Sequence, residues 1–349
     1  MMRILIITSK AVSLTNVARD IAYVAQKLGH VPRLTRIMPL TTEVSRVADA
    51  VIFVYPASPL FCTSYFAKFR EYRVHAGVPC VFYTTLEGRL TTYLVKTWMR
   101  RDLEFVANSN YTAHWLREAG LQVLGVVHHG IVREQVEVAK KMVHVARKNL
   151  EKVHGDKVIF GALAFWHKRK GLDYLAKAIK VLSEKRKDFV VHLVTNSQTM
   201  KYIGSIEGLY VDTVFGTRSR EEILAFLGAL DWLIIPSLAE GFCLPLLEAN
   251  AMGTPAIHCL YQPLTEISDV DANIPFPYDE VVLEDLGEGF DYEMHRYDPK
   301  ILAKAMEEAI EIRLHDERDY RQRCERVRRV LDRFDAEKLY PQLLKYLGA

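Results

Sequence analysis

Two glutamates eight positions apart are the residues of this sequence best suited to bind a polar ligand. Glu240 and Glu248 lie in the segment 237–257, SLAEGFCLPLLEANAMGTPAI, directly after a strand pattern over 232–236. Pro245 fits the first turn of a helix, because the amide hydrogen that proline lacks would be unpaired there. The segment therefore predicts a strand, a loop that carries Glu240, and a helix that carries Glu248 about one turn from its start.

The backbone between the two glutamates is expected to bind an anion. Gly241, Phe242, Cys243 and Leu244 come at the positive end of the helix dipole, where amide groups lack partners within the helix. Amides placed in this way hold phosphate, and the flanking carboxylates can accept hydrogen bonds from the hydroxyls of a sugar or of ribose. A ligand that offers both a phosphate and a polyol is a nucleotide sugar. The alternative is an ordinary strand-to-helix turn with surface glutamates.

A basic turn is the second segment that could do chemistry. The stretch 159–175 ends an apolar strand in His167, Lys168, Arg169 and Lys170, before a predicted helix. When a nucleoside diphosphate leaves a sugar, negative charge grows on its phosphate oxygen, and a fixed cation aimed at that oxygen lowers the barrier. Lys170 is the preferred candidate for this role. A solvated basic turn is the alternative, above all at the other three positions.

The surrounding elements alternate along the whole chain. Short apolar runs such as 3–8 and 50–55 are separated by amphipathic segments, and the alternation starts again at Lys157. This pattern predicts α/β domains with parallel, doubly wound sheets, and 349 residues suffice for two of them. We expect a first domain over 1–130, with a C-terminal helix over 335–349 packed back on it, and a second domain over 131–334. Ligands of such sheets bind at the carboxyl ends of the strands.

Composition excludes several other classes of protein. The net charge of +3, from 46 Lys and Arg against 43 Asp and Glu, gives no argument for a nucleic-acid partner. The five cysteines form no C-x-x-C pair, which argues against structural zinc and a disulfide framework and fits a reducing cytoplasm. No run of eighteen apolar residues predicts a membrane span, so we expect a soluble, cytoplasmic protein. Seven Asn and seven Gln, roughly half the usual share, are typical of thermophile proteins.

The glutamate segment resembles a known family. Its E-x7-E spacing, EGFCLP followed by LEANAMGTP, is similar to glycosyltransferase family 4 of the GT-B class, and the similarity spans most of the chain. The resemblance implies two Rossmann-like domains facing across a cleft, and a retaining enzyme that uses activated sugars without a metal or other cofactor. It also implies that Glu240 contacts the transferred sugar, that Glu248 binds the ribose, and that the amides of 241–244 contact sugar and diphosphate. Cys243 stands where glycine is commoner in the family.

Other segments match the family with departures. Lys170 matches the lysine of a strand, loop, K-G signature, but the arginine that is usual six residues earlier is Ala164 here. Three neighbours could replace it: Arg169, Lys168 and His167. The run 212–237 resembles the family's strands and helix before the glutamate motif. It places Arg218 at a strand end where the family binds the base, although a surface position is equally consistent with Arg218.

The first domain departs more from the family pattern. Gly130 in VVHHGI matches a near-constant glycine at the switch to the linker. Where the family often carries a histidine after the strand 78–84, this chain continues through Thr84 to Glu87. Glu87 could supply a hydrogen-bond acceptor or base on the acceptor side; a loop-solvated glutamate is the alternative. No base is required, because retaining transfer in this class is described as front-face, with the leaving phosphate accepting the acceptor's proton.

Three further features leave alternatives open. The D-x-D at Asp269 and Asp271 is how metal-dependent glycosyltransferases of another fold hold a cation, but it falls in 268–295, where nine acidic residues predict a surface loop or lid. The Arg-rich helix expected over 313–334 is a solvated face or a docking surface. Two aromatic and basic groups either contact a membrane or pack on their own sheet. They are Phe61, Tyr65, Phe69 and Tyr72 with Lys68, Arg70 and Arg73, and Tyr93 and Trp98 with Arg100 and Arg101.

Taken together, the sequence predicts a metal-independent, retaining hexosyltransferase. Its donor would be a UDP-, GDP- or ADP-linked sugar, and its acceptor a hydroxyl of a saccharide, a lipid-linked saccharide or another molecule, with peripheral membrane contact as an open option. One alternative is an epimerase of nucleotide sugars or a glycosyl phosphorylase with the same fold. The other is an inactive nucleotide-sugar-binding protein, which the missing arginine at Ala164 and the missing histidine suggest.

Overall fold

The chain folds into two compact units. The computed structural model describes residues 1–214 and 216–348, so Phe215 of the run 212–237 and Ala349 of the helix expected over 335–349 lie outside the described residues. The first unit comprises Met1–Val132, Leu283–Glu293 and Phe334–Ala349, and the second comprises Arg133–Val282 and Met294–Arg333. The sequence had placed 283–293 in the second domain, whereas this segment groups with the first unit.

The first unit is built on a six-stranded parallel sheet with the order β2-β1-β3-β4-β6-β7. Its central strands β1 and β3 are apolar along almost their whole length and buried, as expected for parallel strands whose two faces are both covered by helices. The strands are Arg3–Thr8 (β1), Val31–Thr35 (β2), Ala50–Pro56 (β3), Cys80–Thr85 (β4), Glu104–Ala107 (β6) and Gln122–Val126 (β7).

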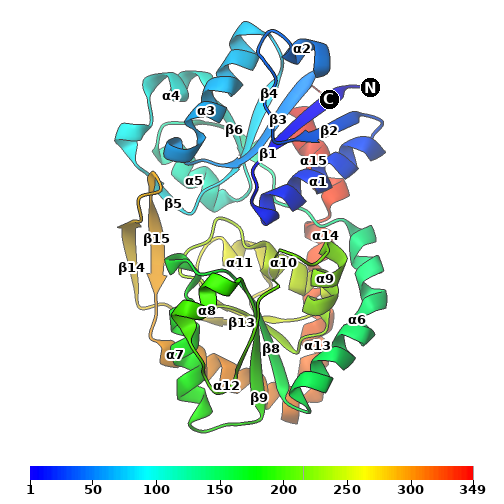
Figure 1. Cartoon of the computed structure of the whole chain (residues 1–349), viewed down its shortest axis with the longest axis vertical. Helices are drawn as coiled ribbons and strands as arrows, with labels where there is room; N and C mark the ends of the chain where they lie inside the picture. Colours follow the sequence, from blue (N-terminus) through cyan, green and yellow to red (C-terminus); the bar gives the residue numbers. More distant parts are fainter. Residues whose placement is uncertain (215, 349) are drawn as a thin grey trace. The chain divides into compact units, whose positions relative to one another are not determined.

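The helices of the first unit include one from the end of the chain. Helices α1 and α15 pack against each other (Figure 1), and an ion pair of 2.8 Å joins Lys27 of α1 to Glu337 of α15. The helices are Val12–Lys27 (α1), Val44–Val47 (α2), Pro59–Arg70 (α3), Glu71–His75 (η1), Thr92–Leu94 (η2), Thr97–Asp102 (α4), Asn110–Glu118 (α5) and Ala336–Lys345 (α15).

The second unit is built on another six-stranded parallel sheet, with the order β10-β9-β8-β11-β12-β13. Its strands are Val158–Leu163 (β8), Phe189–Val194 (β9), Leu209–Asp212 (β10), Trp232–Ile235 (β11), Ala256–Cys259 (β12) and Ile274–Phe276 (β13). Its helices are Arg133–His154 (α6), Lys168–Lys170 (η3), Leu172–Ser183 (α7), Ser197–Ile203 (α8), Arg220–Gly228 (α9), Leu244–Met252 (α10), Leu264–Ile267 (α11), Pro299–His315 (α12), Glu317–Val327 (α13) and Val330–Arg333 (α14). Helix α6 packs on α9, and α7 packs on α12 (Figure 1).

Strand order reverses once in each sheet, between β1 and β3 in the first and between β8 and β11 in the second. Neighbouring strands at such a switch point send their following segments to opposite faces, and this opens a crevice at their carboxyl ends where ligands bind. In the second unit the turn after β8 carries Lys170, and the loop after β11 carries Glu240. The topology therefore brings the two segments singled out from the sequence to one place.

The acidic segment 268–295 is not the loop that the sequence predicted. It contains β13 and the hairpin of Glu280–Asp285 (β14) and Phe290–Arg296 (β15), and β15 pairs antiparallel with Gly88–Leu90 (β5). Burial alternates along β15, where Phe290 and Tyr292 are buried and the polar residues between them are not. The prediction failed because the acidic residues that suggested a loop occupy the less buried positions of a period-two pattern.

Two residues of the aromatic stripe on α3 and η1 belong to the core. Phe69 and Tyr72 are buried, and their rings lie 5.8 and 6.1 Å from the ring of Phe53 on β3. The basic residues beside the stripe pair with acidic ones: Lys68 with Glu71, Arg70 with Asp102, and Arg73 with Glu104. Phe69 and Tyr72 therefore pack on their own sheet, whereas Phe61 at the start of the stripe is 57% exposed.

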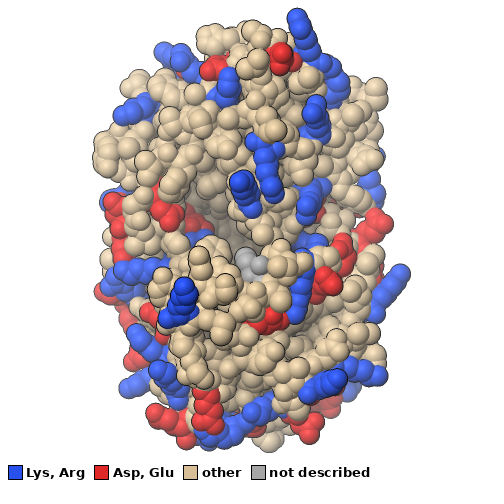
Figure 2. Space-filling model, viewed as in Figure 1, with Lys and Arg blue, Asp and Glu red and all other residues tan. Residues whose placement is uncertain are grey.

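Charges of both signs are interspersed over the face of the molecule shown in Figure 2, which fits the small net charge. Among the helices that the structure describes, none combines the length and apolar character needed to cross a bilayer. The Arg-rich stretch 313–334 is not one helix, since α12 ends at His315 and Asp316 caps the separate helix α13 through its side chain.

Candidate functional site

Glu240 lies at the centre of a buried cluster of charges in the second unit. Its carboxylate accepts from Lys170 Nζ at 2.6 Å and from Ser237 Oγ at 2.7 Å, both at Oε1. Arg169 Nη1 approaches the other oxygen, Oε2, at 3.4 Å. Glu240 is only 4% exposed. The structure thus joins Lys170, Arg169 and Glu240, which the sequence proposed from separate segments, and adds Ser237, which it did not.

Backbone contacts fix the basic turn against the glutamate loop. The amide of Leu238 donates to the carbonyl of Arg169 at 2.7 Å. Gly171 adopts a left-handed conformation with φ 61°, and a Cβ atom there would lie 2.0 Å from the carbonyl oxygen of Pro236. Glycine after Lys170 is therefore required twice, for its positive φ and for the close approach of the next loop. His167 caps the turn, since its Nδ1 accepts from the amide of Arg169 at 3.3 Å.

The electrostatics of the cluster keep Glu240 ionised. Burial by itself raises the pKa of this carboxyl group, but the charges of Lys170 and Arg169, with hydrogen bonds from Lys170 and Ser237, bring the pKa below its ordinary value. One carboxylate and two cations leave a net charge of +1 in a buried setting. Such a site attracts an anion more strongly than an exposed pair does, because burial weakens screening by solvent.

The start of α10 lies directly after this cluster. Cys243 adopts φ 79° and ψ 70°, and it is the only residue other than glycine with a positive φ in the described part of the chain. A left-handed backbone costs a residue with a Cβ atom about 1–2 kcal/mol, and strain of this kind gathers at functional sites. Cys243 is the N-cap residue of α10. The turn formed by Gly241, Phe242, Cys243 and Leu244 is buried and gives the helix an anion-binding end.

Glu248 lies in α10 and has an arginine as its partner. Arg220 Nη1 lies 2.8 Å from Glu248 Oε1, and the two side chains are 11% and 6% exposed. Arg220 begins α9, directly after Ser219, whose side chain forms a capping box with Glu222. The sequence analysis missed Arg220. The capping box locates the start of α9, but nothing in the local sequence indicates that its first residue contacts Glu248.

The other predicted residues lie elsewhere. Arg218 pairs with Asp212 at 2.6 Å and covers the ring of Phe226, and it contacts neither glutamate among the described residues. Lys168 is exposed.

The two acceptor-side residues belong to the first unit. Thr84 is 2% exposed and donates to the carbonyl of Tyr55 at 2.7 Å, so its hydroxyl serves the sheet. Glu87 is half-buried, and its carbonyl accepts from the amide of Glu293 at 3.2 Å.

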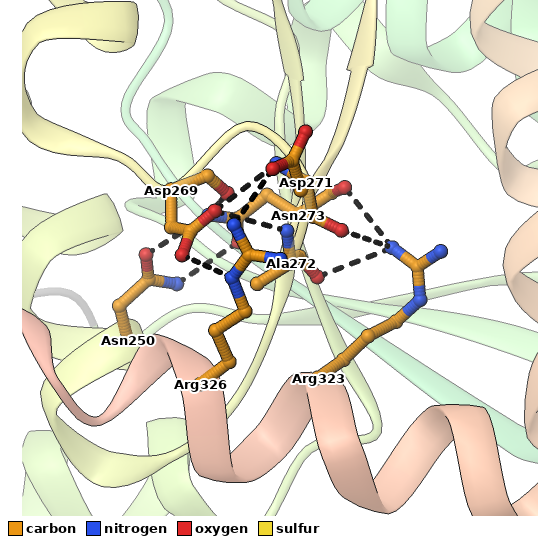
Figure 3. Close-up of polar contacts among 7 residues, drawn as sticks. All are labelled: Asn250, Asp269, Asp271, Ala272, Asn273, Arg323 and Arg326. Atoms are coloured by element: carbon orange, nitrogen blue, oxygen red, sulfur yellow. Dashed lines mark hydrogen bonds and ion pairs between the residues drawn. The ribbon is translucent and has the colours of Figure 1, made fainter.

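The D-x-D carboxylates are held by the Arg-rich helix α13 (Figure 3). Arg326 contacts Asp269 at 2.6 Å and Asp271 at 2.7 Å. Arg323 Nη1 donates to three successive carbonyls of the same turn, at 3.2 to 3.3 Å. Part of this helix is therefore a docking surface within the chain, and the remainder of its charge faces solvent. A search of residues 1–214 and 216–348 finds no group of three or more His, Cys, Asp or Glu side chains placed to hold a metal ion.

Comparisons with known proteins find similarity to glycosyltransferases. Residues 156–278, which contain the basic turn and both glutamates, match the family model of glycosyl transferases group 1. The chain is 29% identical over 348 residues to an uncharacterised glycosyltransferase of Sulfolobus islandicus rod-shaped virus 1, covering 99% of this chain and all of that protein. A shorter stretch of 106 residues, 29% of this chain and 26% of the relative, is 35% identical to the MMP alpha-(1->4)-mannosyltransferase of Mycolicibacterium hassiacum.

Solved structures share the fold over the whole length. The Anabaena protein HepE in complex with UDP and glucose superimposes with a TM-score of 0.71 at 14% identity, and all of both chains is covered. The α,α-trehalose 6-phosphate synthase of Burkholderia multivorans gives a TM-score of 0.70 at 10% identity, covering 99% of this chain and 98% of that one. At these identities the similarity shows the fold, two Rossmann-like domains of the GT-B type.

Proposed function

We propose that this chain is a glycosyltransferase of the GT-B fold that transfers a hexosyl unit from a nucleotide sugar with retention of configuration and without a metal ion. The observation that carries the proposal is the contact of Lys170 with Glu240 at 2.6 Å, at the switch point of the second sheet and beside the start of α10. Cations, a carboxylate and a helix N-terminus at one point match a ligand that combines diphosphate and sugar.

Each residue of the cluster has a role in the proposed reaction. The diphosphate lies against the amides at the start of α10, and Lys170 and Arg169 face the phosphate oxygen that gains charge as the donor bond breaks. Arg169 supplies the second cation that is missing at Ala164, since its guanidinium already reaches the Glu240 carboxylate. Glu240 accepts hydrogen bonds from the sugar, and Glu248 from the ribose.

The bond changes balance without a protein base. The bond from the anomeric carbon to the diphosphate oxygen breaks, and the acceptor oxygen bonds to the same face of that carbon. The acceptor's proton passes to the departing phosphate oxygen. This route requires no catalytic role of Glu87 or Thr84. The proposed acceptor is a hydroxyl of a saccharide, of a lipid-linked saccharide or of another molecule.

The comparisons suggest which donors to try first. HepE binds UDP and UDP-glucose in its solved complexes, and the Mycolicibacterium relative is a mannosyltransferase. A hexose on UDP, GDP or ADP is therefore the proposed donor class. We also propose that the enzyme works in a reducing compartment such as the cytoplasm, since all five cysteines are unpaired in the structure.

Donor turnover tests the proposal directly. The purified chain is incubated with UDP-glucose, GDP-mannose or ADP-glucose, with and without simple sugar acceptors, and release of the nucleoside diphosphate is measured. We expect slow hydrolysis of one donor, faster release with an acceptor, no effect of EDTA, and an anomeric configuration in the product that matches the donor by NMR. Tight binding without hydrolysis or transfer would favour an inactive binding protein, and turnover that requires inorganic phosphate would favour a phosphorylase.

A further inference from the structure

The ion pair between Arg220 and Glu248 has no part in the bond changes proposed above. Its two side chains come from different helices, α9 and α10, which pack against each other. Both are nearly buried, at 11% and 6% exposure. Breaking such a pair leaves a buried charge without its partner and is costly. The pair therefore constrains the Glu248 carboxylate strongly, at the point where the proposed function requires it to bind a ligand.

The position of Arg220 is itself fixed. Arg220 is the first residue of α9, and the capping box of Ser219 and Glu222 closes the turn around it, with hydrogen bonds of 3.1 and 2.7 Å. The guanidinium engages Glu248 at Oε1. In the part of the chain that the structure describes, no hydrogen bond to Glu248 Oε2 is found.

We propose that Arg220 is a positioning residue that orients Glu248 to accept hydrogen bonds from the ribose diol, and so makes the enzyme prefer ribonucleotide donors to 2′-deoxyribonucleotide donors. The inference rests on the proposed function, in which Glu248 binds ribose. The guanidinium holds the carboxylate at one oxygen, and a carboxylate has acceptor capacity for two hydroxyls. A 2′-deoxyribose offers one of those hydroxyls, and the oriented carboxylate loses one bond.

The test compares the affinities of UDP and 2′-deoxy-UDP in the full-length protein by calorimetry. Should a thermal-shift screen favour guanine, GDP and 2′-deoxy-GDP replace them. A hydrogen bond to a charged group corresponds to about tenfold or more in affinity, so the wild type is expected to prefer the ribonucleotide by about that factor. Glu248→Gln and Arg220→Gln are each expected to bring the ratio close to one. Arg220→Lys, which keeps the charge but loses the planar fork, is expected to give an intermediate ratio.

A matched control separates positioning from general stability. Arg313 pairs with the buried Asp231 at 2.8 Å, and Asp231 precedes β11 while the site follows it. Arg313→Gln should lower the melting temperature as Arg220→Gln does, yet keep the preference for the ribonucleotide. With the nucleotide-sugar donors, the Arg220 variants should raise KM more than they lower kcat.

The outcomes distinguish this inference from the proposed function. If the wild type prefers UDP and Glu248→Gln loses the preference, but both Arg220 variants retain it, the role of Arg220 is overturned while that of Glu248 stands. If the wild type binds both nucleotides equally, or Glu248→Gln keeps the preference, the ribose role of Glu248 itself fails. Arg220→Lys keeps the test open should Arg220→Gln not fold.

Discussion

Two buried carboxylates lie at opposite ends of the same strand, and they differ in what surrounds them. Asp231 directly precedes β11 and Glu240 follows it. They are 3% and 4% exposed, and each contacts two cations: Asp231 contacts Arg313 at 2.8 Å and Arg147 at 3.1 Å, as Glu240 contacts Lys170 and Arg169. By residue type and burial alone the two clusters are nearly the same.

The two carboxylates differ in their hydrogen-bond partners and in the backbone beside them. Asp231 also accepts from the amide of Ile159 at 2.8 Å, and its carbonyl accepts from the hydroxyl of Tyr320, so it ties together elements at the amino end of the sheet. Glu240 precedes the strained Cys243, the N-cap residue of α10. Buried ion pairs are therefore weak indicators of function by themselves. What distinguishes the Glu240 site from the Asp231 cluster is its place at the carboxyl ends of the strands at a switch point, beside the left-handed residue that begins a helix.

The largest difference between the two ends should be seen in turnover. Glu240→Ala and Lys170→Ala are each expected to lower kcat by about a hundredfold to a thousandfold, the usual loss when one electrostatic contact to the developing charge is removed. Circular dichroism and thermal melts should show a retained fold. Asp231→Asn is the control, with kcat close to that of the wild type. Near-normal turnover in either site variant would contradict the assigned roles.

For the free energy of unfolding, we expect the larger loss at the Asp231 end of the strand. Asp231→Asn leaves Arg313 and Arg147, which are 33% and 26% exposed, without their carboxylate, and we expect a loss of about 1–3 kcal/mol in the free energy of unfolding. Urea denaturation followed by fluorescence measures this loss. Two results would contradict the difference between the strand ends. One is a urea midpoint of Asp231→Asn equal to that of the wild type, and the other is a loss of turnover in Asp231→Asn as large as that in Glu240→Ala.

Two buried histidines on other strands of the same sheet make the stability of the protein sensitive to acid. Burial lowers the pKa of His258 on β12 to about 4, and burial with nearby His154 lowers that of His192 on β9 to about 4. These values lie below the ordinary 6.5, so the unfolded chain takes up protons first as the pH falls. The contribution of each histidine to the free energy of unfolding is fully present above about pH 6.5. It decreases toward pH 4, by a few kcal/mol for each histidine.

Denaturant titrations at pH 8, 6 and 5 test this slope. His258→Asn should flatten the slope, because asparagine does not titrate in this range. His315→Asn is the matched control, since His315 is largely exposed, and it should keep the wild-type slope. A His258→Asn profile as steep as the wild type would show that the acid loss arises elsewhere, for instance in the carboxylate clusters.

The smallest effect concerns the strain that only the Glu240 end carries. Glycine is usually less stable than alanine by about 0.5–1 kcal/mol at an ordinary position. At φ 79° the order should reverse, since alanine keeps the left-handed strain and glycine has none. We therefore expect Cys243→Gly to be more stable than Cys243→Ala by up to about 1 kcal/mol. If Cys243→Ala melts at a higher temperature than Cys243→Gly, backbone strain at residue 243 does not distinguish the two strand ends.

Local patterns made much of the fold and part of the site predictable. Glu240, Pro245 and Glu248 lie in one segment whose strand, loop and helix follow from its own residues, and Gly171 marks the turn after Lys170. The β14–β15 hairpin was missed because its many acidic residues suggested a loop, and on β15 the buried residues that alternate with Asp291 and Glu293 show as strand only when burial is known.

Contacts between distant segments were beyond local patterns. Arg220 and Glu248 are 28 positions apart, and their contact depends on the packing of α9 against α10. Arg218, two positions earlier, was proposed from the sequence as a base-binding or surface residue, and in the structure it pairs with Asp212. The start of α9 and its packing on α10 bring Arg220 to Glu248. The sequence near either residue does not carry that information.

The sequence by itself determined the elements and the chemistry that each carries: apolar strands, a basic turn ending in glycine, and a helix start flanked by carboxylates. These follow from steric and capping preferences that act over a few neighbouring residues. Only the tertiary structure decided that β8 lies beside β11, and hence that Lys170 meets Glu240 while Arg220 meets Glu248. Strand order and helix packing are set by which apolar faces bury one another, and that is a property of the whole chain.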